Sequence, residues 1–361
     1  MLSALVAHCR AGFEAEAARD VTAVGDAAGV PLPVAVATGS GFVTARAVDG
    51  GLALRRWSEA LDAAAPVFIR SAFFGSGPHA IAEAHARARP DRITPLLAAI
   101  EPLRAHAPFG TLWIEHPDTN DGKAMSSLAR SLHARLTGAL EDAGLLDVAQ
   151  AQRPRLHVML PDGATAWVGA SDAARGSPWP MGIARLRMPA AAPSRSTLKL
   201  AEAFATFLGD DEASLVRPGM RAVDLGAAPG GWTWQLARRG VRVIAVDNGA
   251  LKGEVARDPL VTHVREDGLR YRPRRPVDWV VCDIVESPSR IATLMARWMG
   301  EGWARHAIFN LKLPMKKRYD EVLRCREIIA TEARRASTRW SLAVRQLYHD
   351  REEVTAFLNR A

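Results

Sequence analysis

AVDLGAAPGGWTWQL, at residues 222–236, joins three local patterns in one short stretch. An apolar run containing Asp224 predicts a buried strand, the small residues after it predict a tight turn, and the last positions begin an amphipathic helix. Glycine lacks a Cβ, so Gly230 and Gly231 allow the backbone to approach another group closely. A strand, a glycine turn and a helix together predict a ligand site beyond the carboxyl end of a parallel sheet.

The glycine spacing bears on which ligand this turn would hold. Gly226 is followed by Pro229, Gly230 and Gly231, so the G-x-G-x-x-G pattern of dinucleotide-binding proteins is absent. The stretch resembles instead the first motif of S-adenosylmethionine-dependent methyltransferases. Another nucleotide-type ligand and a purely structural turn stay open as alternatives.

The composition predicts a folded protein of two or three domains. The chain has 361 residues, of which 48% are hydrophobic and 24% are charged. It contains no apolar run near the ~18–20 residues of a membrane span and no basic leader at its start. Cys9, Cys282 and Cys325 are too scattered for a disulfide framework or a zinc site. We therefore expect a cytoplasmic protein without a metal centre.

The charge is unevenly distributed along the chain. Residues 1–180 hold 16 Lys and Arg against 18 Asp and Glu, whereas residues 181–361 hold 31 against 21. The half with the glycine turn is therefore the basic half. Such a balance favours a nucleic-acid partner, although a solvated basic surface is an alternative explanation.

Alternating strand-like and helical patterns divide the chain into four parts. These are an N-terminal ferredoxin-like domain at 1–64, a second α+β domain at 65–172, a connector at 173–195 and an α/β domain at 196–361. The connector is rich in Pro, Ser and Gly, and its Trp179, Met181 and Ile183 predict that it packs down.

The last part has the pattern of a doubly wound, mainly parallel sheet. Strand-like runs follow the glycine turn at 242–247, 262–266, 279–283, 307–311, 343–348 and 353–358. The gap between the last two runs is too short for a helical crossover, so we expect the final strand to pair antiparallel. We predict a Rossmann-like methyltransferase domain.

Three carboxylates follow successive predicted strands of this domain. Asp247 lies about 20 residues beyond the glycine turn, where a carboxylate can accept from ribose hydroxyls. Asp267 and Asp283 follow the next two strands, where they could accept from an adenine amino group and a methionine amino group. A cap or loop role is the alternative for each. Three in register favour the methyl-donor site.

Two lysines in LKL triplets suggest the chemistry. Lys312 directly follows an apolar strand, and Lys199 lies on the helix before the glycine-turn strand. A free lysine is mostly protonated at neutral pH, but burial or a neighbouring cation lowers its pKa. Two adjacent lysines could therefore provide one general base, with Asp283 orienting the ammonium and a hydroxyl acceptor. A ribose 2′-hydroxyl suits this arrangement.

Five stretches together resemble one known family: SRSTLKL, DLGAAPGGW, VVCDIVESP, IFNLKLPMKKRY and RQLYHDREEVT. They are similar to the bacterial 23S rRNA 2′-O-ribose methyltransferase M family, which has an FtsJ-type catalytic domain with a Lys-Asp-Lys-Glu set. The similarity covers 177–361 and continues more weakly before it. HPDTNDGKAMSSLARSLHARL looks like the THUMP RNA-binding domain of that family.

The resemblance implies roles for particular residues. Lys312 would be the proton acceptor, with Lys199, Asp283 and a C-terminal glutamate as its partners. Glu353 is favoured over Glu352 for this last position. The contacts to S-adenosylmethionine would come from Ser196, Ala228, Pro229, Gly230, Gly231, Asp247, Asp267 and Asp283. The implied acceptor is a cytidine ribose in the peptidyl-transferase region of 23S rRNA.

The implied partner is 23S rRNA. We expect the protein to act as a monomer and not to bind a membrane. Basic clusters that would contact phosphates are Arg87, Arg89, Arg92 and Arg104 in the first half, and Arg272, Arg274, Arg275, Lys316, Lys317 and Arg318 in the second. A methyltransferase for tRNA, for a small molecule or for a protein is an alternative. So is a non-catalytic RNA-binding protein, which the intact lysine and aspartate set disfavours.

Overall fold

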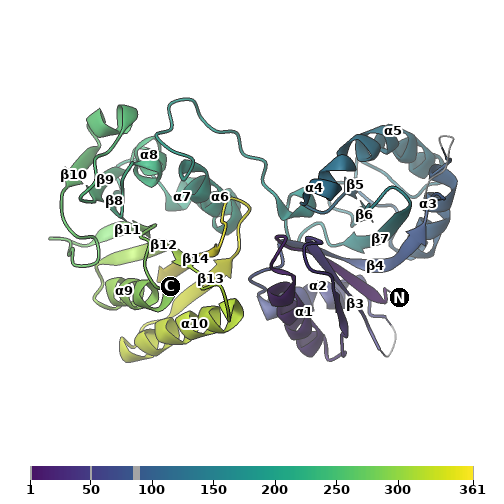
Figure 1. The fold of residues 1–361 in the computed structure, drawn as a ribbon, viewed down its shortest axis with the longest axis horizontal. Helices are drawn as coiled ribbons and strands as arrows, with labels where there is room; N and C mark the ends of the chain where they lie inside the picture. Colours follow the sequence, from purple (N-terminus) through teal and green to yellow (C-terminus); the bar gives the residue numbers. More distant parts are fainter. Residues whose placement is uncertain (1, 49–50, 84–89, 361) are drawn as a thin grey trace. The chain divides into compact units, whose positions relative to one another are not determined.

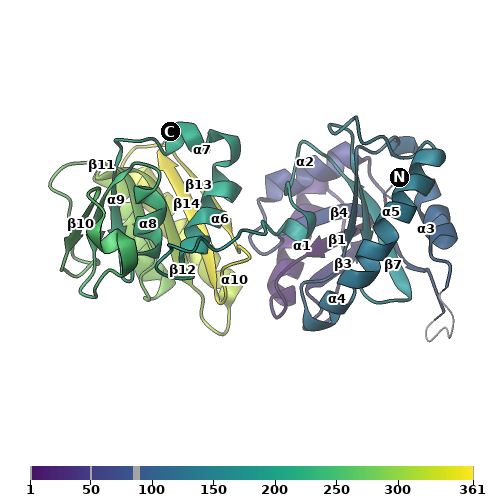
Figure 2. The ribbon, with the colours of Figure 1, turned by 90° about the horizontal axis from the view of Figure 1, so that it is seen from above.

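The computed structural model describes residues 2–48, 51–83 and 90–360. The chain divides into two compact units, Met1–Ile183 and Ala184–Ala361, which Figures 1 and 2 show from two sides. The division falls inside the connector predicted at 173–195. Within it, Met181 and Ile183 are buried, as predicted, while Trp179 is half-buried. The finer division of the first unit at residue 64 stays a prediction.

The first unit is an α+β structure built on one seven-stranded sheet. Its strands are β1 (Ala4–His8), β2 (Val34–Val36), β3 (Phe42–Arg46), β4 (Ser71–Ala80), β5 (Thr111–Glu115), β6 (Arg155–Met159) and β7 (Thr165–Ser171). Its helices are α1 (Glu14–Ala28), α2 (Leu54–Ala64), α3 (Ile93–Ile100), α4 (Asn120–Ala124) and α5 (Ser126–Asp142), with short 3₁₀ turns η1 (Glu101–His106) and η2 (Pro180–Gly182).

Both parts predicted at 1–64 and 65–172 contribute to this sheet. The strand order is β2-β3-β1-β4-β7-β6-β5, so β1 and β4 are hydrogen-bonded neighbours. β6 and β7 form an antiparallel hairpin. The strand-like pattern of VFIRSAFF predicts a strand from Val67, but β4 begins only at Ser71. The buried Asp20 carboxylate explains the delay, because it accepts from the backbone N–H groups of Val67, Phe68 and Ile69 at 2.5–3.1 Å.

A row of hydrogen-bonded polar side chains crosses the interior of the first sheet. Glu115 contacts His157 Nδ1 at 2.7 Å, and His157 Nε2 contacts Ser171 Oγ at 2.8 Å. All three side chains, which we call the buried triad, are shielded from water. Burial opposes the charge on Glu115, but His157 and His8 outweigh it and hold the pKa of Glu115 below its usual range. Glu115 also accepts from the backbone N–H of Met181 at 2.5 Å, which ties down the connector.

The second unit is a Rossmann-like α/β domain, as predicted. Its strands are β8 (Arg221–Leu225), β9 (Arg242–Val246), β10 (Val261–Val264), β11 (Val277–Cys282), β12 (Ala304–Lys312), β13 (Trp340–Arg345) and β14 (Glu353–Arg360). Its helices are α6 (Thr197–Phe207), α7 (Glu212–Leu215), α8 (Gly231–Ala237), α9 (Pro288–Gly300) and α10 (Arg318–Arg335), with 3₁₀ turns η3 (Gly209–Asp211) and η4 (Gly253–Arg257).

The strand order of this unit is β10-β9-β8-β11-β12-β14-β13. The first five strands are mutually parallel, whereas β14 lies antiparallel between β12 and β13. This confirms the antiparallel final strand. Because parallel strands end at the same edge, the residues after β8, β9, β10, β11 and β12 share the edge at which α/β proteins bind ligands.

Large apolar side chains hold the helices on this sheet. Figure 1 shows α6 and α8 on one face and α9 and α10 on the other. Phe204 of α6 and Trp232 of α8 belong to one buried cluster with Trp279 of β11. Complete burial of such a side chain stabilises the fold by about 2 kcal/mol. The helix that carries Lys199 is therefore fixed on a rigid support.

Candidate active site

The glycine turn lies between the end of β8 and the start of α8, as predicted. Gly226 has φ +77°, and a Cβ added there would lie 2.6 Å from Ile284 Cγ1. A Cβ on Gly231 would lie 2.4 Å from Ser196 Oγ. The close approach that these glycines allow is thus to the chain itself, because it packs the turn against the loop after β11 and the start of α6.

A cavity of about 310 Å³, which we call the strand-end cavity, opens at the carboxyl edge beside this turn. Of the residues predicted for the methyl donor, its lining includes Ala228, Asp247, Asp267 and Asp283. The other four, Ser196, Pro229, Gly230 and Gly231, are not among its lining residues. Gly230 faces Val255, Gly231 faces Ser196 and Ser194, and Pro229 accepts from the Lys252 backbone. The structure therefore brings together the predicted carboxylates, and it gives these glycines a packing role.

Two of the carboxylates in the strand-end cavity also hold its loops. Asp247 accepts from the backbone N–H groups of Ala228 and Gly249 at 3.0 and 2.7 Å. Asp267 accepts from Leu269 N at 2.9 Å. A carboxylate offers about four lone-pair positions, so each keeps acceptor capacity for a ligand. The loop role that the sequence left open as an alternative is therefore present and is compatible with the predicted ligand role, which stays a prediction.

Asp224, at the end of the strand before the glycine turn, is a buried acid. Its Oδ2 accepts from Thr233 Oγ1 at 2.6 Å, and its buried Oδ1 has no hydrogen-bond partner in the described part of the chain. Burial, together with the charges of Asp283 and Asp247, outweighs the Thr233 hydrogen bond and raises the pKa of Asp224 to about 7. An aspartate in an otherwise apolar strand was the available signal.

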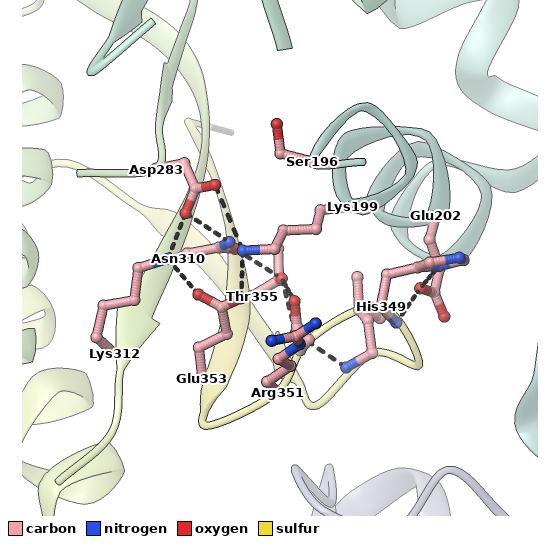
Figure 3. Close-up of polar contacts among 12 residues, drawn as sticks. Ser196, Lys199, Glu202, Asp283, Asn310, Lys312, His349, Arg351, Glu353 and Thr355 are labelled. Carbon is pink, nitrogen blue, oxygen red and sulfur yellow. Dashed lines mark hydrogen bonds and ion pairs between the residues drawn. The ribbon is translucent and has the colours of Figure 1, made fainter. Parts of the chain in front are cut away.

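Lys199, Asp283, Lys312 and Glu353 meet beside the strand-end cavity, and we call them the lysine–carboxylate cluster (Figure 3). Lys312 Nζ contacts both Asp283 Oδ1 and Glu353 Oε2. Lys199 Nζ contacts Glu353 Oε1 and lies 3.4 Å from Asp283 Oδ2. Each lysine therefore bridges the same two carboxylates. Side-chain exposures between 6% and 22% leave the cluster reachable from solvent but largely desolvated.

Strand register and helix packing set these positions. Lys312 lies directly opposite Glu353 in the antiparallel β12–β14 pair. Asp283 follows β11, which is the parallel neighbour of β12. Lys199 reaches the same point from α6, whose start is held by a hydrogen bond from Trp232 Nε1 to Ser196 O at 3.1 Å. Ser196 thus supports the helix that presents Lys199.

The pKa of Lys312 moves in the direction opposite to the expectation. Burial lowers it, but the charges of Asp283 and Glu353 outweigh burial and hold the pKa above the usual lysine value. The sequence suggested that a second lysine would lower the pKa. The structure instead places carboxylates between the two lysines, so Lys312 is an ammonium at neutral pH.

The structure also separates the two candidate glutamates. Glu353 is almost fully buried and contacts both lysines. Glu352 points elsewhere, being 62% exposed and paired with Arg318 Nη2 at 2.7 Å. Glu352 lies just before the first residue of β14, and its side chain points to Arg318, so Glu353 alone of the two joins the cluster.

A second cavity of about 440 Å³ lies on the face of β9 and β10. No helix connects β10 to β11 in this described part of the chain, and the loop from Glu266 to Arg275 covers the strands instead. We call this space the arginine cavity. The arginines that line it are Arg221, Arg242, Arg274 and Arg275. None of these four forms an ion pair with a described carboxylate, and Glu266 is the acidic residue of the lining.

The other predicted basic residues are placed unequally. Arg87 and Arg89 lie outside the described residues. Arg92 donates to Gly163 O, and Arg104 pairs with Glu101, so neither is free for a phosphate without rearrangement. Arg272 lies over the Trp303 ring at 5.7 Å. Lys316 and Lys317 are exposed on the loop after β12.

A larger cavity of about 940 Å³ lies between α9 and α10. Its lining includes none of the predicted site residues, and two of its three arginines, Arg324 and Arg335, lie near glutamates of the same helix. Size alone therefore does not make it the candidate site. Within the described ranges, no group of three or more His, Cys, Asp or Glu could hold a metal ion. No helix of that part is long and apolar enough to span a membrane.

Comparisons with known proteins give the same assignment from two directions. The family model "Ribosomal RNA large subunit methyltransferase M, N-terminal" matches residues 91–172, and the model "FtsJ-like methyltransferase" matches residues 192–302. A ribosomal RNA large subunit methyltransferase M from Azoarcus sp. (strain BH72) is 48% identical over 99% of this chain and 96% of its own length. Its counterpart from Xanthomonas oryzae pv. oryzae (strain PXO99A) is 47% identical over 99% of this chain and all of its own length.

Solved structures similar to this chain are more distant. TrmN from Thermus thermophilus is 18% identical, with coverage of 99% of both chains and a TM-score of 0.35. Fibrillarin from Aeropyrum pernix is 16% identical over 56% of this chain and 81% of its own, with a TM-score of 0.33.

Proposed function

The chain belongs to the ribosomal RNA large subunit methyltransferase M family, and on that basis we propose that it methylates a ribose 2′-hydroxyl of large-subunit ribosomal RNA. The methyl donor is S-adenosylmethionine. The observation that carries the choice of a hydroxyl acceptor is the lysine–carboxylate cluster. It lies beside the strand-end cavity and supplies groups that can hold and remove a hydroxyl proton.

The strand-end cavity fits this methyl donor in its chemistry. Its polar lining is acidic, and Asp247, Asp267 and Asp283 can accept from the ribose hydroxyls, the adenine amino group and the methionine ammonium. Ala228 provides backbone at the glycine turn. Ser196, Pro229, Gly230 and Gly231 would act by shaping the turn and placing α6.

When bound, the donor supplies a methyl group activated by a sulfonium, so the protein has to position the acceptor and remove its proton. Lys312 in its amine form would take the 2′-hydroxyl proton while the ribose oxygen bonds to the methyl carbon and the carbon–sulfur bond breaks. The resulting ammonium would then release its proton to solvent. Asp283 and Glu353 would orient the Lys312 nitrogen, and Lys199 would keep the two carboxylates in place.

Phosphate contacts outside the cluster would hold the RNA. The arginine cavity offers four guanidinium groups that pair with no carboxylate of the described residues, and Lys316 and Lys317 follow the strand that carries Lys312. Such contacts contribute affinity and orientation without reading sequence. We also propose that residues 65–172 act as a THUMP-like RNA-binding part.

The acceptor would be a cytidine in the peptidyl-transferase region of 23S rRNA, acted on by a cytoplasmic monomer. The test is incubation with labelled S-adenosylmethionine and 23S rRNA that lacks its own modifications. We expect label at one alkali-resistant 2′-O-methyl cytidine, found by mapping the product. Label on a base would contradict the ribose assignment. Transfer only to tRNA, to protein or to a small molecule would contradict the ribosomal RNA assignment.

A further inference from the structure

Behind the lysine–carboxylate cluster, a chain of hydrogen bonds runs into the core of the second unit (Figure 3). Asn310 Nδ2 donates to Asp283 Oδ1 at 3.0 Å, and Thr355 Oγ1 contacts Asn310 Oδ1 at 2.8 Å. Thr355 Oγ1 also lies 3.1 and 2.9 Å from the two carboxyl oxygens of Asp350. Asn310, Thr355 and Asp350 are all fully buried.

Strand register places this chain directly beneath the cluster. Asn310 and Lys312 are two residues apart on β12, and their opposite residues on β14 are Thr355 and Glu353. Residues two apart face the same side of a strand. The Asn310–Thr355 pair, which holds Asp283, and the Lys312–Glu353 pair, which performs the proposed chemistry, are therefore neighbours on one face of the β12–β14 strand pair.

Counting protons fixes the direction of the chain. Asp283 faces two ammonium groups and accepts, so the amide of Asn310 must present its N–H₂ to Asp283 and its oxygen to Thr355. The Thr355 hydroxyl has one proton, which this contact uses. The remaining contact between Thr355 and Asp350 then joins two oxygens, and it is favourable only if Asp350 carries a proton.

We propose that Asn310 and Thr355 are positioning residues that hold the Asp283 carboxylate between the two lysines, and that a protonated Asp350 anchors them. This inference rests on the proposed function of the cluster. Complete burial, with the nearby charge of Glu353, raises the pKa of Asp350 well above its usual value, which agrees with the proton count. Leu347 N donates to Asp350 Oδ2 at 3.0 Å, and a proton on Oδ1 can be donated to Thr355 Oγ1 at 3.1 Å.

The same loop is tied to the helix of Lys199. Glu202 lies one turn after Lys199 on α6 and accepts from the backbone N–H groups of Tyr348 and His349 at 2.8 and 2.9 Å. The segment that carries Asp350 is therefore braced from α6 as well as from β14. This explains how a short connection between two strands can serve as an anchor for Asp283.

The decisive comparison is Thr355→Val against Thr355→Ser. Valine keeps the shape of threonine but removes the hydroxyl, so Asn310 loses the group that fixes its amide. We expect kcat to fall about 10-fold, within the ~100-fold that a misplaced reacting group can cost, with the Kd for S-adenosylmethionine unchanged. Serine keeps the hydroxyl and should stay within about twofold of the parent. Equal impairment by both substitutions, or none by valine, would overturn the proposal.

A titration of the Lys312 ammonium by NMR tests the same idea without turnover. Lys312 is surrounded by Asp283 and Glu353, with Lys199 across both carboxylates. If Thr355→Val loosens Asp283, Lys312 loses part of the attraction that raises its pKa, and its titration moves to lower pH. An unchanged titration would contradict the positioning role even if the parent protein methylates nothing. If valine prevents folding, Thr355→Ala against Thr355→Ser gives the same contrast.

Asp350→Asn tests the proton on the anchor. An amide can donate to Thr355 as a protonated carboxyl does, so Asp350→Asn should retain kcat, whereas Asp350→Ala should lower it. Equal loss in both variants would show that Asp350 acts as an anion.

Discussion

The first unit contains a row of hydrogen-bonded side chains of the kind that a hydrolase could use, formed by Ser171, His157 and Glu115. All three side chains are buried in that unit. The lysine–carboxylate cluster of the second unit also consists of side chains in direct contact, but it lies at the open carboxyl edge of its sheet. The two clusters differ in access and not in the quality of their contacts. The buried triad serves as a structural lock, whereas the lysine–carboxylate cluster borders a cavity that can admit a substrate.

The largest expected effect comes from the open cluster. Lys312→Ala should lower kcat for methyl transfer by at least ~100-fold, because a positioned general base contributes about 10²- to 10⁴-fold. Binding of S-adenosylmethionine, measured by calorimetry, should persist. Near-normal turnover would show that Lys312 is not the base. The comparison between a chemically active cluster and a structural triad would then fail.

The second effect concerns the buried triad. Glu115→Gln removes the charge that faces His157 and should destabilise the protein by about 3 kcal/mol, as expected for a broken buried pair. Because the folded-state pKa of Glu115 is depressed, its contribution is fully present above the usual carboxyl pKa and is lost as the pH falls from there through the folded-state pKa. Denaturant unfolding of the parent and of Glu115→Gln at neutral and acidic pH measures the loss of stability and its dependence on pH.

Ser171→Ala sharpens the same contrast. It should cost only about 1 kcal/mol, the net value of one hydrogen bond, and leave kcat unchanged. If methyl transfer is lost in a folded Ser171→Ala protein, the triad would have a chemical role and the comparison would fail.

The third effect tests the arginine cavity. Changing both Arg274 and Arg275 to alanine should weaken RNA binding about 10-fold and reduce the slope of log K against log salt by between ~1 and ~2, since about one counterion is released per phosphate contact. Fluorescence anisotropy at several salt concentrations measures this. Arg334 and Arg335, which lie near glutamates of α10, are a charge-matched control and should change little. Equal losses of RNA affinity in both variants would show that general positive charge, and not the arginine cavity, accounts for binding.

The smallest effect is a shift along the pH axis. Lys312 must lose a proton before it can act, so kcat should rise with pH toward its raised pKa. Glu353→Gln removes one of the charges that raise this pKa, so the midpoint should move to lower pH, whereas Glu352→Gln should not move it. The raised pKa also means that the ion pairs stabilise the fold below the usual lysine pKa and weaken only as the pH rises through the folded value. A flat profile would contradict the role of Lys312 as a base.

The local pattern of the sequence was enough to predict most of the second unit. The glycine turn, the acidic strand ends and the short gap before the last strand each depend on neighbouring residues, and β8, α8, β9 and β14 appear where those patterns indicate. Strand ends also converge by topology, which is why Asp283 and Lys312 could be expected together. The strand predicted from Val67 was placed too early, because Asp20, distant in sequence, takes the hydrogen bonds of that segment.

By itself, the sequence indicated the family, the methyl donor and the candidates Lys199, Lys312 and Asp283. Only the tertiary structure decided that carboxylates lie between the lysines and raise the pKa of Lys312. It also decided that Glu353 faces the cluster, and that Asn310 and Thr355 stand behind Asp283. The physical reason is that pKa values and hydrogen-bond direction depend on groups brought within a few ångströms by strand register and helix packing. Sequence spacing does not encode those distances.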